Sequence, residues 1–166
     1  MKRHIFLIGF MGSGKSFVGQ RLAEKLNYLF IDLDKEIEKA TGNTIKKIFV
    51  RYGEHYFRKK ENEILSTLKD KIIKSCVIAT GGGIILNPLN VKIMKQMGQI
   101  VFLNTEWKTI WHNIKNSSDS RPLLDNKTEI DIKILYLARL PLYKRYADKV
   151  ITDCKTFDIN KLVQCG

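Results

Sequence analysis

The residues with the clearest chemical meaning form a phosphate-binding loop near the start of the chain. Residues 9–16 read Gly-Phe-Met-Gly-Ser-Gly-Lys-Ser and match the pattern G-x-x-x-x-G-K-[ST] at every fixed position. The glycines let the backbone curl so that several N–H groups face phosphate oxygens. Lys15 can reach the β- and γ-phosphates of ATP, and the hydroxyl of Ser16 can bind Mg²⁺. We expect the cofactor-binding residues of this region to be Gly12, Ser13, Gly14, Lys15, Ser16 and Phe17.

Two carboxylates, Asp32 and Asp34, lie at the C-terminal end of the second predicted strand, residues 29–33. P-loop proteins commonly hold Mg²⁺ with an acid at a strand end, but the third strand runs into Thr80 and three glycines. The acidic partner of the metal is therefore expected to be Asp32. Asp34 lies two residues further, so the two side chains point to opposite sides if the strand continues. They can both face the P loop if a helix has begun by Asp34, which could alternatively serve only as the cap of that helix.

Alternating strands and helices are predicted to position these residues. The expected strands are residues 4–10, 29–33, 76–80, 100–103 and 150–152. The expected helices are residues 16–27, 34–40, 44–71, 87–97, 107–115 and 129–147, with a last short helix near the C-terminal end. We expect breaks at Gly42 and Gly53, and Pro141 is expected to break or kink the helix that contains it. The alternation predicts an α/β fold with a parallel sheet covered on both faces, whose ligands bind beyond the carboxyl ends of the strands.

Composition limits the class of protein. The 166 residues fit one domain, and 29 Lys and Arg against 17 Asp and Glu give a net charge of +12. A basic surface can attract nucleic acid, membranes or small anions. We find no nucleic-acid motif and no run near the roughly 20 apolar residues of a membrane span. We therefore expect no nucleic-acid or membrane partner, and a monomer that binds a small-molecule substrate.

The cysteines and the first residues of the chain indicate the cellular compartment in which the protein works. Cys76, Cys154 and Cys165 show no C-x-x-C spacing, which argues against an internal disulfide framework and the usual zinc sites. Free thiols suit a reducing, cytoplasmic environment. The apolar residues after Arg3 have some likeness to a short signal peptide, but they fit a buried strand entering the P loop more closely.

Six segments, in this order, resemble the shikimate kinase family over nearly the whole chain. They are the P loop at 9–16, Asp-Leu-Asp at 32–34, Phe-Arg-Lys-Lys-Glu at 57–61, three glycines at 81–83, Arg-Pro-Leu-Leu at 121–124 and Arg-Leu-Pro-Leu-Tyr at 139–143. The resemblance implies a three-layer P-loop kinase fold with a five-stranded parallel sheet in a single domain, 1–166. It also implies a substrate-binding segment at about 33–61 and a lid at about 113–127. The implied reaction transfers the γ-phosphate of ATP to the 3-hydroxyl of shikimate, a step of aromatic amino-acid biosynthesis.

The resemblance also implies roles for single residues. Arg58 and Arg139 would hold the carboxylate of shikimate, which suits the planar fork of arginine. Asp34 would orient or deprotonate the attacking hydroxyl, and Arg121 on the lid would close over the phosphates of ATP. The implied catalytic residues are Lys15, Asp34 and Arg121. The implied substrate-binding residues are Asp34, Arg58, Gly81, Gly82, Gly83 and Arg139, with backbone N–H groups of the glycines approaching the ligand. Phe49 and Phe57 would either border the ring of the substrate or belong to the core.

One position departs from the family pattern. Family members commonly carry a basic residue, often arginine, about seven positions before the lid arginine, where it stacks on adenine. That position here is Ile114, with Lys115 beside it. The adenine contacts are therefore left open, and Lys155, after the fifth strand, is a second candidate contact.

Two other functions compete with this interpretation. A different small-molecule kinase, such as a gluconate kinase-like protein, would also use an arginine clamp, because its acceptor carries a carboxylate. An ATP-binding protein linked to nucleic acid would suit the net charge of +12 but needs neither the Asp pair nor a lid arginine. A GTPase is disfavoured because the sequence contains no D-x-x-G motif.

Overall fold

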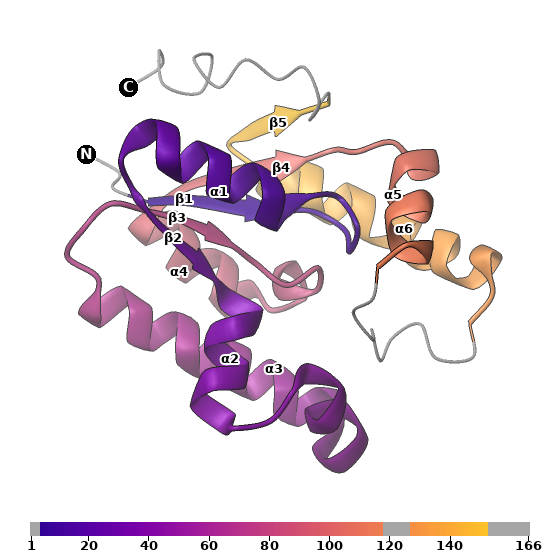
Figure 1. Ribbon diagram of the computed structural model, residues 1–166, viewed down its shortest axis with the longest axis horizontal. Helices are drawn as coiled ribbons and strands as arrows, with labels where there is room; N and C mark the ends of the chain where they lie inside the picture. Colours follow the sequence, from indigo (N-terminus) through magenta and orange to yellow (C-terminus); the bar gives the residue numbers. More distant parts are fainter. Residues whose placement is uncertain (1–3, 118–126, 153–166) are drawn as a thin grey trace.

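Five parallel strands form the sheet of the computed structural model, which describes residues 4–117 and 127–152 (Figure 1). The strands are β1 (His4–Ile8), β2 (Leu29–Asp32), β3 (Cys76–Ala79), β4 (Gly98–Leu103) and β5 (Lys149–Ile151). Their order in the sheet is β2-β3-β1-β4-β5, and every neighbouring pair is parallel. Because β1 and β3 are neighbours, the segments that leave their carboxyl ends meet at one edge of the sheet.

Both faces of the sheet are buried. Along β1, Phe6 and Ile8 pack into one apolar cluster and Leu7 into the other, as the two-residue period of a strand requires. Figure 1 shows α1 on one face and α4 and α6 on the other. The helices are α1 (Lys15–Leu26), α2 (Leu33–Thr41), α3 (Ile45–Lys71), α4 (Pro88–Met97), α5 (Trp107–Lys115) and α6 (Glu129–Tyr146), with a short 3-10 helix, η1 (Ile84–Leu86). This arrangement confirms the predicted α/β fold and its five-stranded parallel sheet.

The chain turns from β2 into α2 without a loop. Asp32 is the last residue of β2 and the N-cap of α2, and its side chain accepts hydrogen bonds from the backbone N–H groups of Asp34 and Lys35. Asp34 therefore lies in the first helical turn, as required for both carboxylates to face the P loop. The alternative in which Asp34 caps the helix is wrong, because Asp32 fills that position.

Glycine and proline act differently in the later helices. The predicted breaks are confirmed: Gly42 ends α2 at φ 66°, and Gly53 interrupts α3 with φ 78° and ψ 174°. Pro141 was expected to break or kink its helix. It does not break the helix, since α6 runs from Glu129 to Tyr146, and the kink stays a prediction. Pro141 cannot bond to the carbonyl of Leu137, but both residues are exposed, so water can satisfy that carbonyl.

Some predictions fall on residues that the structure does not describe. These are the predicted last helix and the larger part of the predicted lid, residues 118–126. The division into one domain with a substrate-binding segment and a lid stays a prediction. Within the described part of the chain, no helix combines the length and the apolar character needed to cross a bilayer.

Candidate active site

The P loop, residues 9–16, wraps around the ammonium group of Lys15. Lys15 Nζ donates hydrogen bonds to the carbonyl oxygens of Gly9 at 2.8 Å and Phe10 at 2.9 Å. Gly12 and Gly14 adopt positive φ angles of 78° and 88°, which bend the loop toward this group. Helix α1 begins at Lys15, and no side chain caps its first N–H groups. A buried ammonium beside an uncapped helix N-terminus is an anion-binding arrangement.

Two side chains from distant segments fix the outer side of the P loop. Thr105, after β4, donates from Oγ1 to the carbonyl oxygen of Ser13 at 2.9 Å. Asn113, on α5, donates from Nδ2 to the carbonyl oxygen of Gly12 at 2.8 Å. Both contacts hold loop carbonyls, which leaves N–H groups of the loop for phosphate oxygens. No local pattern in the sequence points to either residue, because each acts across about 90 to 100 positions of the chain.

The predicted metal-binding pair is brought together beside the P loop. Ser16 Oγ donates to Asp32 Oδ2 at 2.8 Å, so one hydroxyl and one carboxylate lie side by side. Oxygen donors of this kind fit Mg²⁺, which takes few protein ligands and completes its octahedron with phosphates and water. The described residues contain no cluster of three or more His, Cys, Asp and Glu side chains, so this pair offers only part of a coordination shell.

Asp34 and Glu61 place two carboxylates on the same side of the segment Gly81–Gly83, here called the glycine turn. A Cβ atom built on Gly81 would lie 3.0 Å from Asp34 Oδ1 and 3.0 Å from Glu61 Oε1. Asp34 Oδ1 is buried and has no hydrogen-bond partner among the described residues. Burial and the neighbouring Asp32 raise the pKa of Asp34 from 3.8 to about 6, against the opposing charges of Lys15 and Arg58. Burial raises the pKa of Glu61 to about 7, although Arg58 favours its charged form.

Arg58 is held by two glutamates of its own helix, α3. Its guanidinium contacts Glu61 at 3.0 Å and 3.1 Å through Nη1, and Glu54 at 3.1 Å through Nη2. The Glu61 side chain is fully buried, and the Arg58 side chain is 16% exposed. Arg58 is therefore not a solvated surface charge, unlike the exposed Lys59 beside it. Glu61 was not among the predicted site residues, although its position three residues after Arg58 on a predicted helix indicates a helical ion pair.

Arg139 approaches the same place from α6. It is only 4% exposed, and it donates a hydrogen bond from Nη1 to the carbonyl oxygen of Gly82 at 3.4 Å. Its guanidinium also interacts with the hydroxyl of Tyr143 on the same helix. Its buried Nε has no partner in the described part of the chain. No carboxylate of the described residues is seen in a direct ion pair with it, although its charge favours the ionised form of the nearby Glu61. A buried guanidinium with unused donors is a site for an anionic group.

The glycine turn is needed to make room for charged side chains. A Cβ atom on Gly83 would lie 2.1 Å from Arg58 Nη2, so only glycine leaves space for that guanidinium. Gly81 leaves space for the carboxylates of Asp34 and Glu61. Gly82 lies against the P loop, where a Cβ atom built on it would be 3.2 Å from the backbone nitrogen of Met11. The expected approach of the glycine N–H groups to a ligand stays a prediction.

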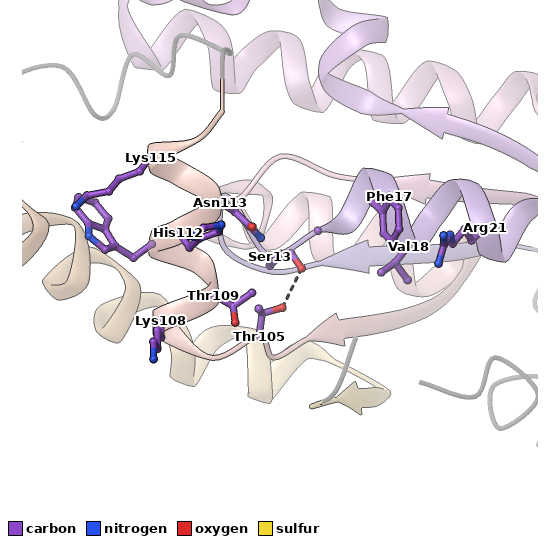
Figure 2. Close-up of a pocket in the computed structure, with 12 residues that line it drawn as sticks. Ser13, Phe17, Val18, Arg21, Thr105, Lys108, Thr109, His112, Asn113 and Lys115 are labelled. Atoms are coloured by element: carbon purple, nitrogen blue, oxygen red, sulfur yellow. Dashed lines mark hydrogen bonds between the residues drawn. The ribbon is translucent and has the colours of Figure 1, made fainter. Parts of the chain in front are cut away.

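Two cavities open on either side of the P loop. The first, here called the α1–α5 cavity, measures about 920 Å³ and lies between these helices. Figure 2 shows Phe17, Val18 and Arg21 on its α1 side, and Lys108, Thr109 and His112 on its α5 side. The second, here called the glycine-turn cavity, measures about 880 Å³. Its lining includes Lys15, Ser16, Asp32, Asp34, Phe49, Phe57, Arg58, the glycine turn and Arg139.

The remaining residues named from the sequence differ in where they lie. The rings of Phe49 and Phe57 pack with centroids 4.8 Å apart and planes tilted by 40°. Both residues line the glycine-turn cavity and also contact the core, so both expected roles are compatible with their position. Ile114 is 7% exposed and packs in the core, so it contributes nothing to either cavity. Its neighbour Asn113 instead lines both cavities. Arg121 and Lys155 lie outside the described residues.

Comparison with known proteins decides the family. The shikimate kinase family profile matches residues 11–164. The chain belongs to the shikimate kinase family. A shikimate kinase of Persephonella marina is 41% identical over 154 residues, which is 93% of this chain and 92% of the relative. One of a Sulfurihydrogenibium species is 42% identical over 93% of this chain and 90% of its own length.

A solved structure of the family agrees with the fold. It is a shikimate kinase from Acinetobacter baumannii in complex with shikimate, with a TM-score of 0.86 and 37% identity. The match covers 98% of this chain and 89% of that one. Shikimate kinases are phosphotransferases with an alcohol acceptor that take phosphate from ATP, and the P loop and parallel sheet of this chain are those of the family.

Proposed function

We propose that this chain transfers the γ-phosphate of ATP to the 3-hydroxyl of shikimate, giving shikimate 3-phosphate and ADP. Asp34 and Arg139 carry the proposal, because each lines the glycine-turn cavity with a buried polar atom that has no partner among the described residues. One is an acceptor suited to a hydroxyl, and the other is a donor suited to a carboxylate. Shikimate offers both groups on one small ring.

The two cavities suit the two substrates. The α1–α5 cavity would take the nucleoside, and the P loop between the cavities would hold the phosphates. Phe17 lines both cavities, and the guanidinium of Arg21 lies 4.3 Å from the centre of its ring. The nucleoside would pack against these two side chains. Lys15 lines the glycine-turn cavity, so its charge is available where the γ-phosphate meets the acceptor. Ser16 and Asp32 would hold Mg²⁺, which supplies positive charge to the phosphates. The proposed setting is the cytoplasm, with the chain acting as a monomer.

On the acceptor side, Asp34 would accept the proton of the attacking hydroxyl or align that hydroxyl. Arg58 and Arg139 would bind the carboxylate of shikimate with charge-assisted hydrogen bonds. Glu61 would keep the Arg58 guanidinium in place beside Gly83. Arg121 would complete the phosphate contacts.

A coupled assay of ADP release tests the proposal. The purified chain is incubated with ATP, Mg²⁺ and a panel of hydroxy acids that includes shikimate and gluconate. We expect shikimate to give a kcat/KM at least about 10²-fold above gluconate, since a mismatched acceptor leaves buried polar groups unpaired. Turnover of gluconate at the level of shikimate would reject the assignment of the acceptor.

Replacing Arg139 by alanine is expected to weaken acceptor binding by about 10- to 150-fold. Charge-assisted hydrogen bonds contribute roughly 1.5–3 kcal/mol, and each 1.4 kcal/mol is a factor of about ten. Arg139→Lys should rescue poorly because an ammonium lacks the planar fork. The KM for shikimate is the measurement, and the KM for ATP should hardly change.

Arg139 is the cleaner of the two arginines to test. Arg58→Ala would leave the fully buried Glu61 without its partner, which lowers the stability of the fold by about 3–5 kcal/mol. A loss of shikimate binding could then not be told apart from a loss of folding. The exposed Lys144, on the same helix, is a matched control whose replacement should change neither KM. If Arg139→Ala impaired ATP binding and spared the KM for shikimate, the acceptor site would be misplaced.

The pH dependence of kcat/KM for shikimate should report the ionisation of Asp34. Its carboxyl must be ionised to accept a hydroxyl proton, and its pKa is about 6. Below that pH the group is protonated, so kcat/KM for shikimate should fall about tenfold per pH unit. Titration of kcat/KM between pH 4.5 and 8, with ATP saturating, measures this. A flat profile down to pH 5 would contradict the role given to Asp34.

A further inference from the structure

Tyr143 lies under the acceptor site without lining either cavity. It is completely buried, and its ring stacks on Phe102 of β4 with centroids 5.1 Å apart and planes at 17°. A phenylalanine would fill the same volume and make the same stack. The hydroxyl therefore adds something that packing alone does not require, since burying it without a partner would be costly.

The hydroxyl of Tyr143 reaches the glycine turn. It donates a hydrogen bond to the carbonyl oxygen of Gly82. Burial raises the pKa of Tyr143 well above its usual range, so the hydroxyl keeps its proton and remains a donor at physiological pH. The stack on Phe102 fixes the ring against the sheet, so the Gly82 carbonyl is tied to a rigid part of the fold.

Arg139 uses the same carbonyl oxygen. Arg139 and Tyr143 are four residues apart on α6, which places them on one face of the helix. The contact from Arg139 Nη1 to the Gly82 oxygen is long, at 3.4 Å, and is weak by geometric criteria. A contact of this length does not by itself hold a carbonyl or a guanidinium in one orientation. The bond from Tyr143 can hold the carbonyl, because the ring of Tyr143 is itself fixed by its stack on Phe102.

We propose that Tyr143 is a positioning residue, whose hydroxyl fixes the Gly82 carbonyl and thereby orients the guanidinium of Arg139 for the acceptor carboxylate. The inference rests on the proposed function. Without the hydroxyl, Arg139 is the only side chain seen to donate to this carbonyl, and its guanidinium moves onto that oxygen and away from the substrate. The loss falls on acceptor binding, because the carbonyl and Arg139 both belong to the acceptor side of the P loop.

The test is Tyr143→Phe, compared with Tyr136→Phe as a matched control. Tyr136 lies on the same helix, is 8% exposed, and packs against Phe10 and Trp107 with no hydroxyl hydrogen bond among the described residues. Tyr143→Phe is expected to raise the KM for shikimate by about 3- to 10-fold, the effect of one hydrogen bond. The KM for ATP should not change, and kcat should change by less than about twofold. Tyr136→Phe should alter neither KM.

A double-mutant cycle with Arg139→Ala tests the route of the effect. If Tyr143 acts through Arg139, adding Tyr143→Phe to Arg139→Ala should lower kcat/KM for shikimate by less than about twofold. A full additional effect would overturn the inference. So would a Tyr143→Phe variant with a lower melting temperature and both KM values unchanged, because the hydroxyl would then only stabilise the fold. A wild-type chain that does not phosphorylate shikimate would instead overturn the proposed function.

Discussion

Lys15→Ala is expected to lower kcat for shikimate phosphorylation by about 10³-fold. Removing one preorganised donor from a developing negative charge costs about 10²–10³ in rate, and Lys15 also removes a full positive charge. The ammonium lies inside the P loop and lines the glycine-turn cavity, where the transferred group must pass. The measurement is single-turnover phosphoryl transfer with saturating ATP, so that weaker nucleotide binding does not enter the rate.

The fold of this variant needs its own measurement. Lys15 donates to the carbonyls of Gly9 and Phe10, so alanine leaves both without that partner and the melting temperature should fall by several degrees. Circular dichroism should still show a cooperative transition. The exposed Lys25, in the last turn of the same helix, is the matched control and should retain wild-type activity. Retained turnover in a folded Lys15→Ala variant would reject the role of the P loop.

Asp34→Asn is expected to lower kcat by about 10²–10⁴-fold while leaving the KM for ATP near its wild-type value. The amide keeps the shape of the carboxylate but cannot take a proton, and general base catalysis contributes about that factor. The neighbouring Glu38, which also lines the glycine-turn cavity, is bonded to the backbone of Ile45 and offers a comparison in the same helix. Glu38→Gln should lose far less activity than Asp34→Asn. An unchanged rate in Asp34→Asn would remove Asp34 from the mechanism.

Stability separates a catalytic role of Asp34 from a structural one. Folding raises the pKa of Asp34 from 3.8 to about 6, so the ionised form is disfavoured in the folded state. The wild type therefore loses stability as pH rises from about 4 to 6, by up to about 3 kcal/mol, and stays lower above that range. Asn carries no such cost. We expect Asp34→Asn to melt higher than the wild type at pH 7, with the difference in melting temperature shrinking as the pH falls from about 6 to 4.

Much of the scaffold could be predicted from neighbouring residues alone. The P loop is a local pattern whose glycines and lysine act within eight positions, so its geometry follows from the sequence wherever a strand precedes it and a helix follows. The apolar runs around Phe6 and Ile78 predicted buried strands, because both faces of a parallel sheet are covered. The helix is not broken at Pro141, and local sequence does not show that Leu137, whose carbonyl loses its helical partner there, is an exposed residue.

The charged part of the site depended on contacts between segments that lie far apart in the chain. Whether Asp34 caps a helix or faces the cavity was decided by Asp32, which takes the capping position and leaves an oxygen of Asp34 unpartnered. The glycine turn has meaning only beside the Arg58 guanidinium, for which Gly83 leaves room. The sequence determined which side chains and turns are available. Packing of α3 and α6 around the carboxyl ends of the strands decided which of them meet, because no local pattern encodes distances between segments 20 to 100 residues apart.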